Sequence, residues 1–219
     1  KMQSVPGILA KAMLADKDYQ NNLPKEFRLK LKSLVVTNVM TYNNMTDVIK
    51  KASKALNEAG IPHVLLKGHS LAVNYPFPEM RQCGDIDLYV GKENYKRAIE
   101  AIAKLDPNGN AIGLETDMHQ HVTINGVEIE VHHTADHLSV RKHRKALDKW
   151  VNECMNLTIT PVSTNTWNDL GTEITLPPHT YNAFFILHHA VRHLASDGIG
   201  LRQICDWMRY LYTYGHDIN

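Results

Sequence analysis

The chain has 219 residues, and its 24 Lys and Arg against 23 Asp and Glu give a formal net charge of +1 with histidine neutral. A chain of this length buries a sizeable core, as one large domain or two small ones. The near-neutral charge argues against a protein that binds long nucleic acid through a broad basic surface. It does not exclude an enzyme that acts on nucleotides.

The cysteines and the hydropathy pattern favour a protein of a reducing compartment. Cys83, Cys154 and Cys205 are far apart, odd in number and outside any CxxC motif, which argues against a disulfide framework or a structural zinc site. No apolar run reaches the roughly 18 residues of a membrane span, and no signal-peptide pattern opens the chain. We therefore expect a cytoplasmic protein without a membrane segment. Because the chain starts with Lys1 and stops soon after a strong helical pattern, we expect a fragment truncated at its C-terminus.

The first part of the chain is predicted to be helical. Residues 1–45 have no sharp pattern, whereas the following stretch reads TDVIKKASKALNEAGI and has an apolar stripe at helical spacing. Thr46 or Asp47 can cap this second helix, and Gly60 can end it. The sequence thus predicts a separate N-terminal helical segment before a new helix begins near residue 46.

Short strands follow. Buried strands are predicted at Val64–Lys67 and at Asp85–Val90, and between them Pro76 and Pro78 force an irregular loop after a possible helix start at SLAVNY. The segment Asn94–Leu105 has the pattern of an amphipathic helix.

The clearest local signal is a β-hairpin in the stretch HVTINGVEIEVHH. Two alternating strands flank Asn125–Gly126, the dipeptide that a type I′ turn prefers. From about residue 138 the pattern becomes mainly helical. We therefore predict an α+β fold with an N-terminal helical segment over 1–45, an α+β core over 46–135 and a mainly helical lobe over 136–219.

Two helices are predicted after Pro177–Pro178, joined by the turn SDGIG. Their apolar residues at helical spacing are predicted to face the core, and the Met and aromatic residues of ICDWMRYLYTY are interpreted in the same way. The apolar set is Phe184, Leu187, Val191, Leu194, Leu201, Ile204, Cys205, Met208 and Leu211.

Acidic side chains alternate with apolar ones on two predicted strands. Residues two apart in a strand share a face, so Asp85 and Asp87 point one way, and so do Glu128, Glu130 and His132 on the second hairpin strand. If the strands are neighbours, four carboxylates and an imidazole converge, and a bound cation resolves their repulsion. Oxygen ligands suit Mg²⁺, and two such ions serve phosphoryl or nucleotidyl transfer. The alternative for both motifs is a solvated strand face.

A glycine turn precedes these strands. In LLKGHS a strand end meets Gly68 and a helix start, where exposed backbone N–H groups form an anion site. Gly68 lets a phosphate approach the backbone, Ser70 can donate its hydroxyl, and Lys67 can neutralise phosphate charge. Arg81 also suits phosphate, although pairing with a nearby acid is an equal alternative.

The order of these motifs resembles the nucleotidyltransferase superfamily that includes polymerase-beta-like and aminoglycoside nucleotidyltransferases. The long gap between Gly68 and Asp85, which contains NYPFPEMRQCG, and the later motifs EVHH and HHAVRHLASDGIGLRQICDW resemble one branch, the uncharacterised bacterial nucleotidyltransferases. The resemblance covers about Ile61 to Leu211. His69 departs from it, since the wider superfamily often has Gly or Ser there.

The resemblance implies a polymerase-beta-like core, a small mixed sheet flanked by helices, with a helical lobe beside it. It implies transfer of a nucleoside monophosphate from an NTP, such as ATP, to an unidentified acceptor hydroxyl, with two Mg²⁺ ions or Mn²⁺. Asp85 and Asp87 would hold both ions, and Glu130 is favoured over Glu128 as the third carboxylate because it stands two residues before His132. His132 would orient that carboxylate or touch substrate.

The histidine-rich helix leaves several alternatives open. His189 and His193 lie at i and i+4, a spacing that metal ligands use, so a zinc hydrolase is a minor alternative, although no H-E-x-x-H motif is present. The resemblance instead suggests that His193, Arg202 and Asp206 line the nucleotide or acceptor side of a cleft or lock the helices together. Arg202 and Asp206 can also pair at i, i+4.

A second functional alternative is a catalytically inactive protein of the same fold that senses nucleotide or binds a partner. His69 in the phosphate turn and the suspected truncation motivate it.

Overall fold

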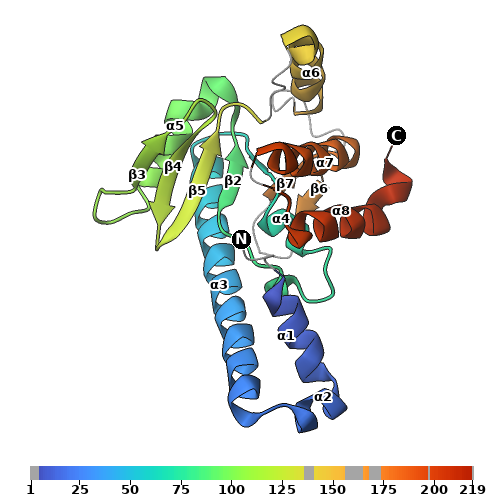
Figure 1. Ribbon diagram of the computed structural model, residues 1–219. Helices are drawn as coiled ribbons and strands as arrows, with labels where there is room; N and C mark the ends of the chain where they lie inside the picture. Colours follow the sequence, from blue (N-terminus) through green and yellow to red (C-terminus); the bar gives the residue numbers. More distant parts are fainter. Residues whose placement is uncertain (1–4, 136–140, 156–164, 168–173, 197, 219) are drawn as a thin grey trace.

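The computed structural model describes residues 5–135, 141–155, 165–167, 174–196 and 198–218 (Figure 1). The helices of the described residues are α1 (Pro6–Ala15), α2 (Lys17–Asn22), α3 (Lys25–Glu58), α4 (His69–Ala72), α5 (Gly91–Ala103), α6 (Arg141–Cys154), α7 (His179–Ser196) and α8 (Leu201–Tyr214), with short 3₁₀ turns at Pro78–Met80 and Gly215–Asp217. The strands are β1 (Val64–Leu65), β2 (Ile86–Tyr89), β3 (Ile112–Glu115), β4 (His119–Ile124), β5 (Val127–His132), β6 (Asn165–Trp167) and β7 (Ile174–Leu176).

A mixed five-stranded sheet organises the fold, with the strand order β1-β2-β5-β4-β3. β2 and β5 run parallel, and the other neighbouring pairs are antiparallel. The predicted α+β fold with a small mixed sheet is confirmed, and so is the hairpin, whose turn residues Asn125 and Gly126 both have positive φ. β3 and the small β6–β7 sheet were not predicted.

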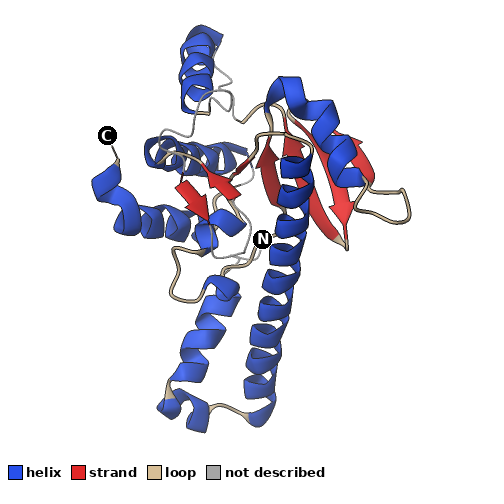
Figure 2. Cartoon of the chain, turned by 180° about the vertical axis from the view of Figure 1, so that it is seen from behind, coloured by secondary structure: helices blue, strands red, loops and turns tan. Residues whose placement is uncertain are grey.

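One face of the sheet carries the main core. The alternation of β2 and β5 directs Ile86, Leu88, Ile129 and Val131 to this face, where all four are buried. The helices α3 and α5 cover it, as the view from behind shows (Figure 2). The predicted inward residues of α5, Ala98, Ile99 and Ile102, are buried there with Leu105 partly buried beside them.

The opposite face meets the helical part of the chain. Val64, Leu66 and Tyr89 pack with Tyr181 and Phe185 of α7 and with apolar residues of α6. This apolar contact lies at the β1–β2 end of the sheet and leaves the polar residues of β2 and β5 beside it.

The predicted helix start near residue 46 is wrong, because α3 is a single helix of 34 residues that begins at Lys25. The Thr46 hydroxyl donates to the carbonyl oxygen of Tyr42 at 2.9 Å, a bond typical of a helix interior. The predicted boundary at residue 45 therefore falls inside α3, which forms a helical hairpin with α1 below the sheet (Figure 1).

The predicted inward stripe of the last two helices is wrong for most of its members. α7 and α8 exist, but their buried faces consist of other residues, among them Ala183, Phe185, Ile186 and Tyr210. Both helices carry apolar residues on more than one side, so periodicity alone did not identify the packed side. Phe184 and Cys205 are partly buried, whereas the exposed set is Leu187, Val191, Leu194, Leu201, Ile204, Met208, Leu211 and Tyr212.

No helix of the described residues is long and apolar enough to cross a membrane.

A buried ion pair joins α8 to the loop before β2. Arg81 Nε and Nη2 lie 3.1 and 2.6 Å from the two carboxylate oxygens of Asp206. The Tyr75 hydroxyl donates to the same carboxylate at 2.8 Å. Arg81 and Asp206 are each 5% exposed, so water screens the pair little. Arg209 of α8 adds a second polar link by donating to the carbonyl oxygen of Asn74.

Because of this burial, we expect Asp206→Asn to lower the free energy of unfolding by about 3–5 kcal/mol, since it leaves the Arg81 charge uncompensated. Denaturant titration measures the change. Asp217→Asn is the control, because Asp217 is an exposed acid paired only at the surface, and should cost less than about 1 kcal/mol. Equal, small losses in both variants would contradict this role of the ion pair.

Candidate active site

Asp87 on β2 lies at the centre of the site and is 1% exposed. Lys67 Nζ lies 3.0 Å from Asp87 Oδ1, and His132 Nε2 lies 3.1 Å from the same oxygen. The other oxygen, Oδ2, has no hydrogen-bond partner among the described residues. Lys67 and His132 therefore hold one side of the carboxylate, and the oxygen on the other side is buried and unpaired among these residues.

The electrostatics of this group keep Asp87 ionised. Burial raises the pKa of Asp87, but the Lys67 charge and the His132 hydrogen bond lower it more, so its pKa lies well below the usual range. Burial lowers the pKa of Lys67, but the neighbouring carboxylates, Asp87 first, raise it above its usual value. The same balance holds for His132. Burial lowers its pKa, but its bonds to Asp87 and Glu130 raise the pKa by more, so it lies above the usual value.

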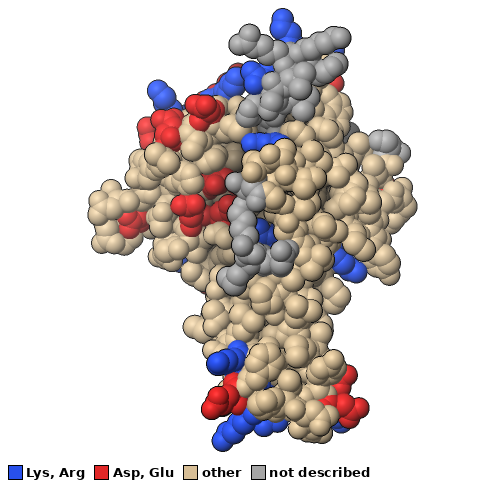
Figure 3. Space-filling view, viewed as in Figure 1, with Lys and Arg blue, Asp and Glu red and all other residues tan. Residues whose placement is uncertain are grey.

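Glu130 lies opposite Asp87 across the parallel pair, because β2 and β5 are neighbours, the condition under which the sequence predicted that the carboxylates converge. Asp87 and Glu130 are directly paired in the β2–β5 register. Glu130 Oε2 lies 3.2 Å from His132 Nε2, and Oε1 lies 3.6 Å from His119 Nε2. Glu128, in contrast, is half exposed and contacts His121 at the edge of the group. Glu130 is thus the hairpin carboxylate that lies beside Asp87, and acidic side chains gather over this part of the sheet (Figure 3).

Asp85 lies immediately before β2, at the end of the loop, and is partly buried. Burial raises its pKa, and the Asp87 charge raises it further. The Lys67 charge opposes this shift without cancelling it, so the pKa of Asp85 stays above its usual value.

The turn at Gly68 approaches both aspartates. Gly68 has φ 63° and ψ −114°, a conformation that side-chain-bearing residues rarely adopt. A Cβ there would lie 3.4 Å from the Asp85 carbonyl oxygen and 3.9 Å from Asp87 Oδ2. The open oxygen of Asp87 therefore faces this turn. Ser70 takes a structural part, because its hydroxyl donates to the Leu66 carbonyl oxygen at 2.8 Å and is thus occupied within the turn.

His69, the departure from the superfamily pattern, points to α3 instead of the site. Its ring stacks on Tyr42 with centroids 4.2 Å apart, and its Nε2 lies 2.9 Å from the Thr46 hydroxyl. Burial first, then the Arg81 charge, lower the pKa of His69 to about 4. The histidine thus fixes the turn to α3 as a neutral side chain.

A small cavity of about 190 Å³ opens beside the turn. Lys67, Gly68 and Asp85 line one side of it, and α7 and α8 line the other with the predicted residues His193, Arg202 and Asp206. This part of the helical lobe therefore borders the site.

The structure decides between alternatives for two arginines of this cavity. For Arg81, which suited phosphate and a nearby acid equally, it shows the second, because the guanidinium is buried in the bond to Asp206. Arg202 was considered a partner of Asp206, but it donates to the Gln82 carbonyl oxygen at 3.0 Å. Asp206 thus holds α8 to the loop before β2. Of the Lys and Arg side chains that line the cavity, Lys67 and Arg202 are the two that do not pair with Asp206.

The histidine pair of α7 lies in the same cavity, with its Nε2 atoms 3.1 Å apart. The described residues contain two groups of three potential metal ligands, and within each group the ligand atoms lie within 4.8 Å of one another. One group is His119, His121 and Glu130, and the other is Asp87, Glu130 and His132. Neither includes His189 or His193, so the structure gives no support to a zinc hydrolase site on α7.

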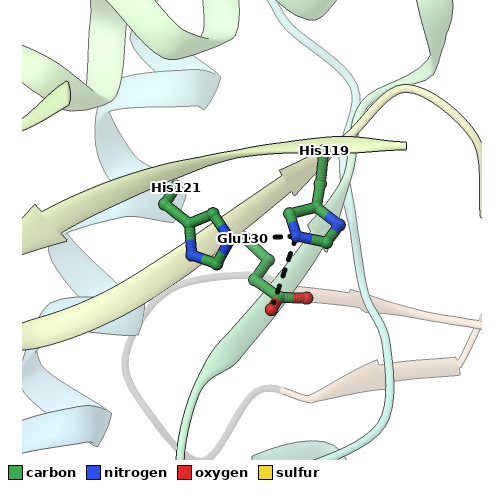
Figure 4. A group of neighbouring side chains, drawn as sticks. All are labelled: His119, His121 and Glu130. Carbon is green, nitrogen blue, oxygen red and sulfur yellow. Dashed lines mark hydrogen bonds and ion pairs between the residues drawn. The ribbon is translucent and has the colours of Figure 1, made fainter. Parts of the chain in front are cut away.

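Sequence reasoning missed His119 and His121 on β4. They share the face of Asp87 and Glu130, because β4 pairs with β5 so that His121 lies opposite Glu130 and His119 opposite His132. Figure 4 shows His119 and His121 on β4 with Glu130 on the neighbouring β5. The H-x-H alternation in HQHVTI is the signal that would have found them, by the same period of two that found the aspartates.

A larger cavity of about 900 Å³ adjoins the cluster through His119. It lies between the start of α5, the β3–β4 turn and α6, with a lining of mixed charge that includes Lys92, Glu93, Asp117 and Arg144. Its volume is within the range of small-molecule sites.

The neutral His69 predicts a pH dependence of stability. In the unfolded chain its pKa is near 6.5, but in the folded protein it is about 4. Between these values the unfolded state binds the extra proton, so the free energy of unfolding falls as pH drops from about 6.5 to about 4, by roughly 3 kcal/mol from this group.

Denaturant titrations of wild type and His69→Gln across pH 4–7 measure this contribution. The variant should lose stability at neutral pH and show a flatter pH dependence. His216→Gln, at an exposed histidine, is the control and should keep the wild-type slope. An unchanged slope in His69→Gln would show that the side chain is not held neutral.

Comparisons with known proteins give the same fold. The solution structure of the antibiotic-resistance factor ANT(2″)-Ia is 15% identical, with a TM-score of 0.55, over 80% of this chain and 86% of that one. The crystal structure of ANT(2″)-Ia in complex with adenylyl-2″-tobramycin is 14% identical, with a TM-score of 0.53, over 79% and 91%. An antigenic nucleotidyltransferase-like protein from Paracoccidioides brasiliensis is 12% identical, with a TM-score of 0.50, over 78% and 77%.

Curated protein sequences give no significant match. A family described as uncharacterised nucleotidyltransferase, in contrast, matches residues 2–219. The sheet, the Gly68 turn and the paired carboxylates thus occur in a chain that belongs to this nucleotidyltransferase family.

Proposed function

We propose that this protein is a Mg²⁺-dependent nucleotidyltransferase that moves a nucleoside monophosphate from an NTP to an acceptor hydroxyl. The observation that carries the proposal is the buried Asp87 carboxylate. One of its oxygens is held by Lys67 and His132, and the other faces the Gly68 turn.

The donor set suits a divalent cation. Asp87 and Glu130 lie in one group of potential metal ligands, and Asp85, two residues before Asp87, is a third carboxylate whose pKa the Asp87 charge raises. Carboxylate oxygens are the ligands that Mg²⁺ and Mn²⁺ prefer. When bound there, the cations supply charge stabilisation at the attacking and leaving oxygens of phosphoryl transfer.

The residues of this chain would then act as follows. The Gly68 turn offers backbone N–H groups and Lys67 and Arg202 offer positive charge to the triphosphate. Glu130 accepts the proton of the acceptor hydroxyl as a general base. His132 holds Glu130 Oε2 at 3.2 Å and so orients that carboxylate between the two strands.

The two cavities provide space for both substrates. The small cavity beside Gly68 and Arg202 suits the phosphates, and the larger one beyond His119 accommodates a nucleoside or a small acceptor. The structure of ANT(2″)-Ia with adenylyl-2″-tobramycin, whose fold this chain shares, supports a small hydroxyl compound as the class of acceptor.

To test the proposal, pyrophosphate release and NTP binding are measured with a panel of NTPs and hydroxyl acceptors in the presence of Mg²⁺ or Mn²⁺. We expect Asp85→Asn and Asp87→Asn to lower turnover by at least about 100-fold. Each variant removes a carboxylate proposed to hold the divalent cations that stabilise the reacting phosphate. Asp47→Asn, at an exposed position of α3, is the matched control and should keep wild-type turnover.

Circular dichroism confirms that each variant is folded, and Asp85→Asn keeps the test valid if loss of the buried Asp87 charge unfolds the protein. Absence of metal-dependent NTP binding in the wild type would overturn the proposal. Binding of NTP without pyrophosphate release from any acceptor would instead support the alternative of a nucleotide sensor.

A further inference from the structure

We propose that His119, His121 and Glu130 form a binding site for a transition metal ion of the Zn²⁺ type, next to the carboxylates of Asp85 and Asp87. The site rests on geometry that is independent of the proposed reaction. Figure 4 shows the three side chains directed toward one another from β4 and β5.

The distances between the potential ligand atoms fit one small ion. The Nε2 atoms of His119 and His121 lie 3.1 Å apart, and His119 Nε2 lies 3.6 Å from Glu130 Oε1. Ligands bound at about 2.1 Å to a tetrahedral ion lie about 3.4 Å from one another. The side chains are 15–18% exposed, so they face one another at the surface of the site, where an ion can enter from solvent.

Backbone pairing holds the ligands in place. His119 and His121 are two residues apart on β4 and so share a face, and β5 places Glu130 directly opposite His121. Because both strands are fixed in the sheet by their other, core-facing residues, Gln120, Val122 and Ile129, the ligand positions depend little on loop conformation.

A second carboxylate supports the orientation of one ligand. His121 Nδ1 lies 3.1 Å from Glu128 Oε1. Nδ1 forms no hydrogen bond in this geometry, but a carboxylate this close favours hydrogen on that nitrogen, which would leave the Nε2 lone pair directed at the group. Metal-bound histidines commonly have such a carboxylate partner on the ring nitrogen away from the ion.

The ligand types distinguish this site from the magnesium position. Two imidazoles and one carboxylate suit Zn²⁺, Co²⁺ or Cu²⁺, whereas Mg²⁺ prefers oxygen ligands. Three protein ligands also leave a fourth position of a tetrahedral ion for water or a substrate atom.

Glu130 connects this site to its neighbour. Its Oε1 faces His119, and its Oε2 faces His132, which in turn bonds Asp87. An ion held by His119 and His121 would therefore also bind Glu130, the carboxylate that we propose as general base. This consequence rests on the proposed function, and it predicts that Zn²⁺ inhibits transfer.

The experiment measures Zn²⁺ affinity by competition with a chromophoric chelator, and Co²⁺ binding by its visible absorption, on the full chain without nucleotide. We expect one ion per chain. His119→Asn and His121→Asn should each weaken binding by at least about 100-fold, and Glu128→Gln by about 10-fold. The Co²⁺ spectrum should have the intensity of a tetrahedral site and disappear in His121→Asn.

Two histidine variants serve as matched controls. His133→Asn changes a partly buried histidine next to the site, and His189→Asn removes one member of the α7 pair. Both should keep wild-type affinity for Zn²⁺. Thermal melting confirms that every variant is folded.

The proposal is overturned if the wild type does not bind Zn²⁺ or Co²⁺, in which case the contact of His119 with His121 is only a hydrogen bond between the two rings. It is also overturned if His189→Asn removes binding and His121→Asn does not. Failure here is separable from failure of the proposed function, because Asp85→Asn should abolish transfer while Zn²⁺ binding to the histidines is retained.

Discussion

A carboxylate buried in the middle of a sheet is the constraint on which this structure depends. Asp87 is almost without solvent contact, and an isolated buried charge would be expelled or protonated. Lys67, two residues after β1, and His132 at the end of β5 therefore contact it, and these contacts fix the positions of three segments at once. The Gly68 turn follows directly after Lys67, so the phosphate turn and the carboxylates share one anchor.

The helical part depends on a second buried charge pair, between Arg81 and Asp206. The loop that carries Arg81 leads into Asp85, so the interaction that holds α8 also determines where the first aspartate lies. His69 also links two segments, because its ring contacts the Thr46 hydroxyl and so joins the Gly68 turn to α3. The candidate site is thus surrounded by buried polar contacts that restrict the loops around it.

The sequence was sufficient for the features that depend on local periodicity. Alternation predicted the faces of β2 and β5, and the resemblance placed Glu130 beside Asp87. It was not sufficient for features decided by tertiary contacts. Arg81 was equally compatible with phosphate and with an acid 125 positions away, so the sequence did not identify its partner. α7 has apolar residues on two sides, so the sequence did not identify its buried face. His119 and His121 had a readable pattern, but only the pairing of β4 with β5 showed what they face.

The parallel register of β2 and β5 has a consequence for folding. A slip of β2 by one residue would turn Asp87 into the apolar core and Ile86 out of it, and a slip of β5 would do the same to Glu130 and Ile129. Hydrophobic burial therefore selects the register that assembles the carboxylates. The core and the site therefore form in one cooperative event. Amide hydrogens of these two strands should accordingly exchange only through global unfolding, unlike those of the exposed end of the α1–α3 hairpin.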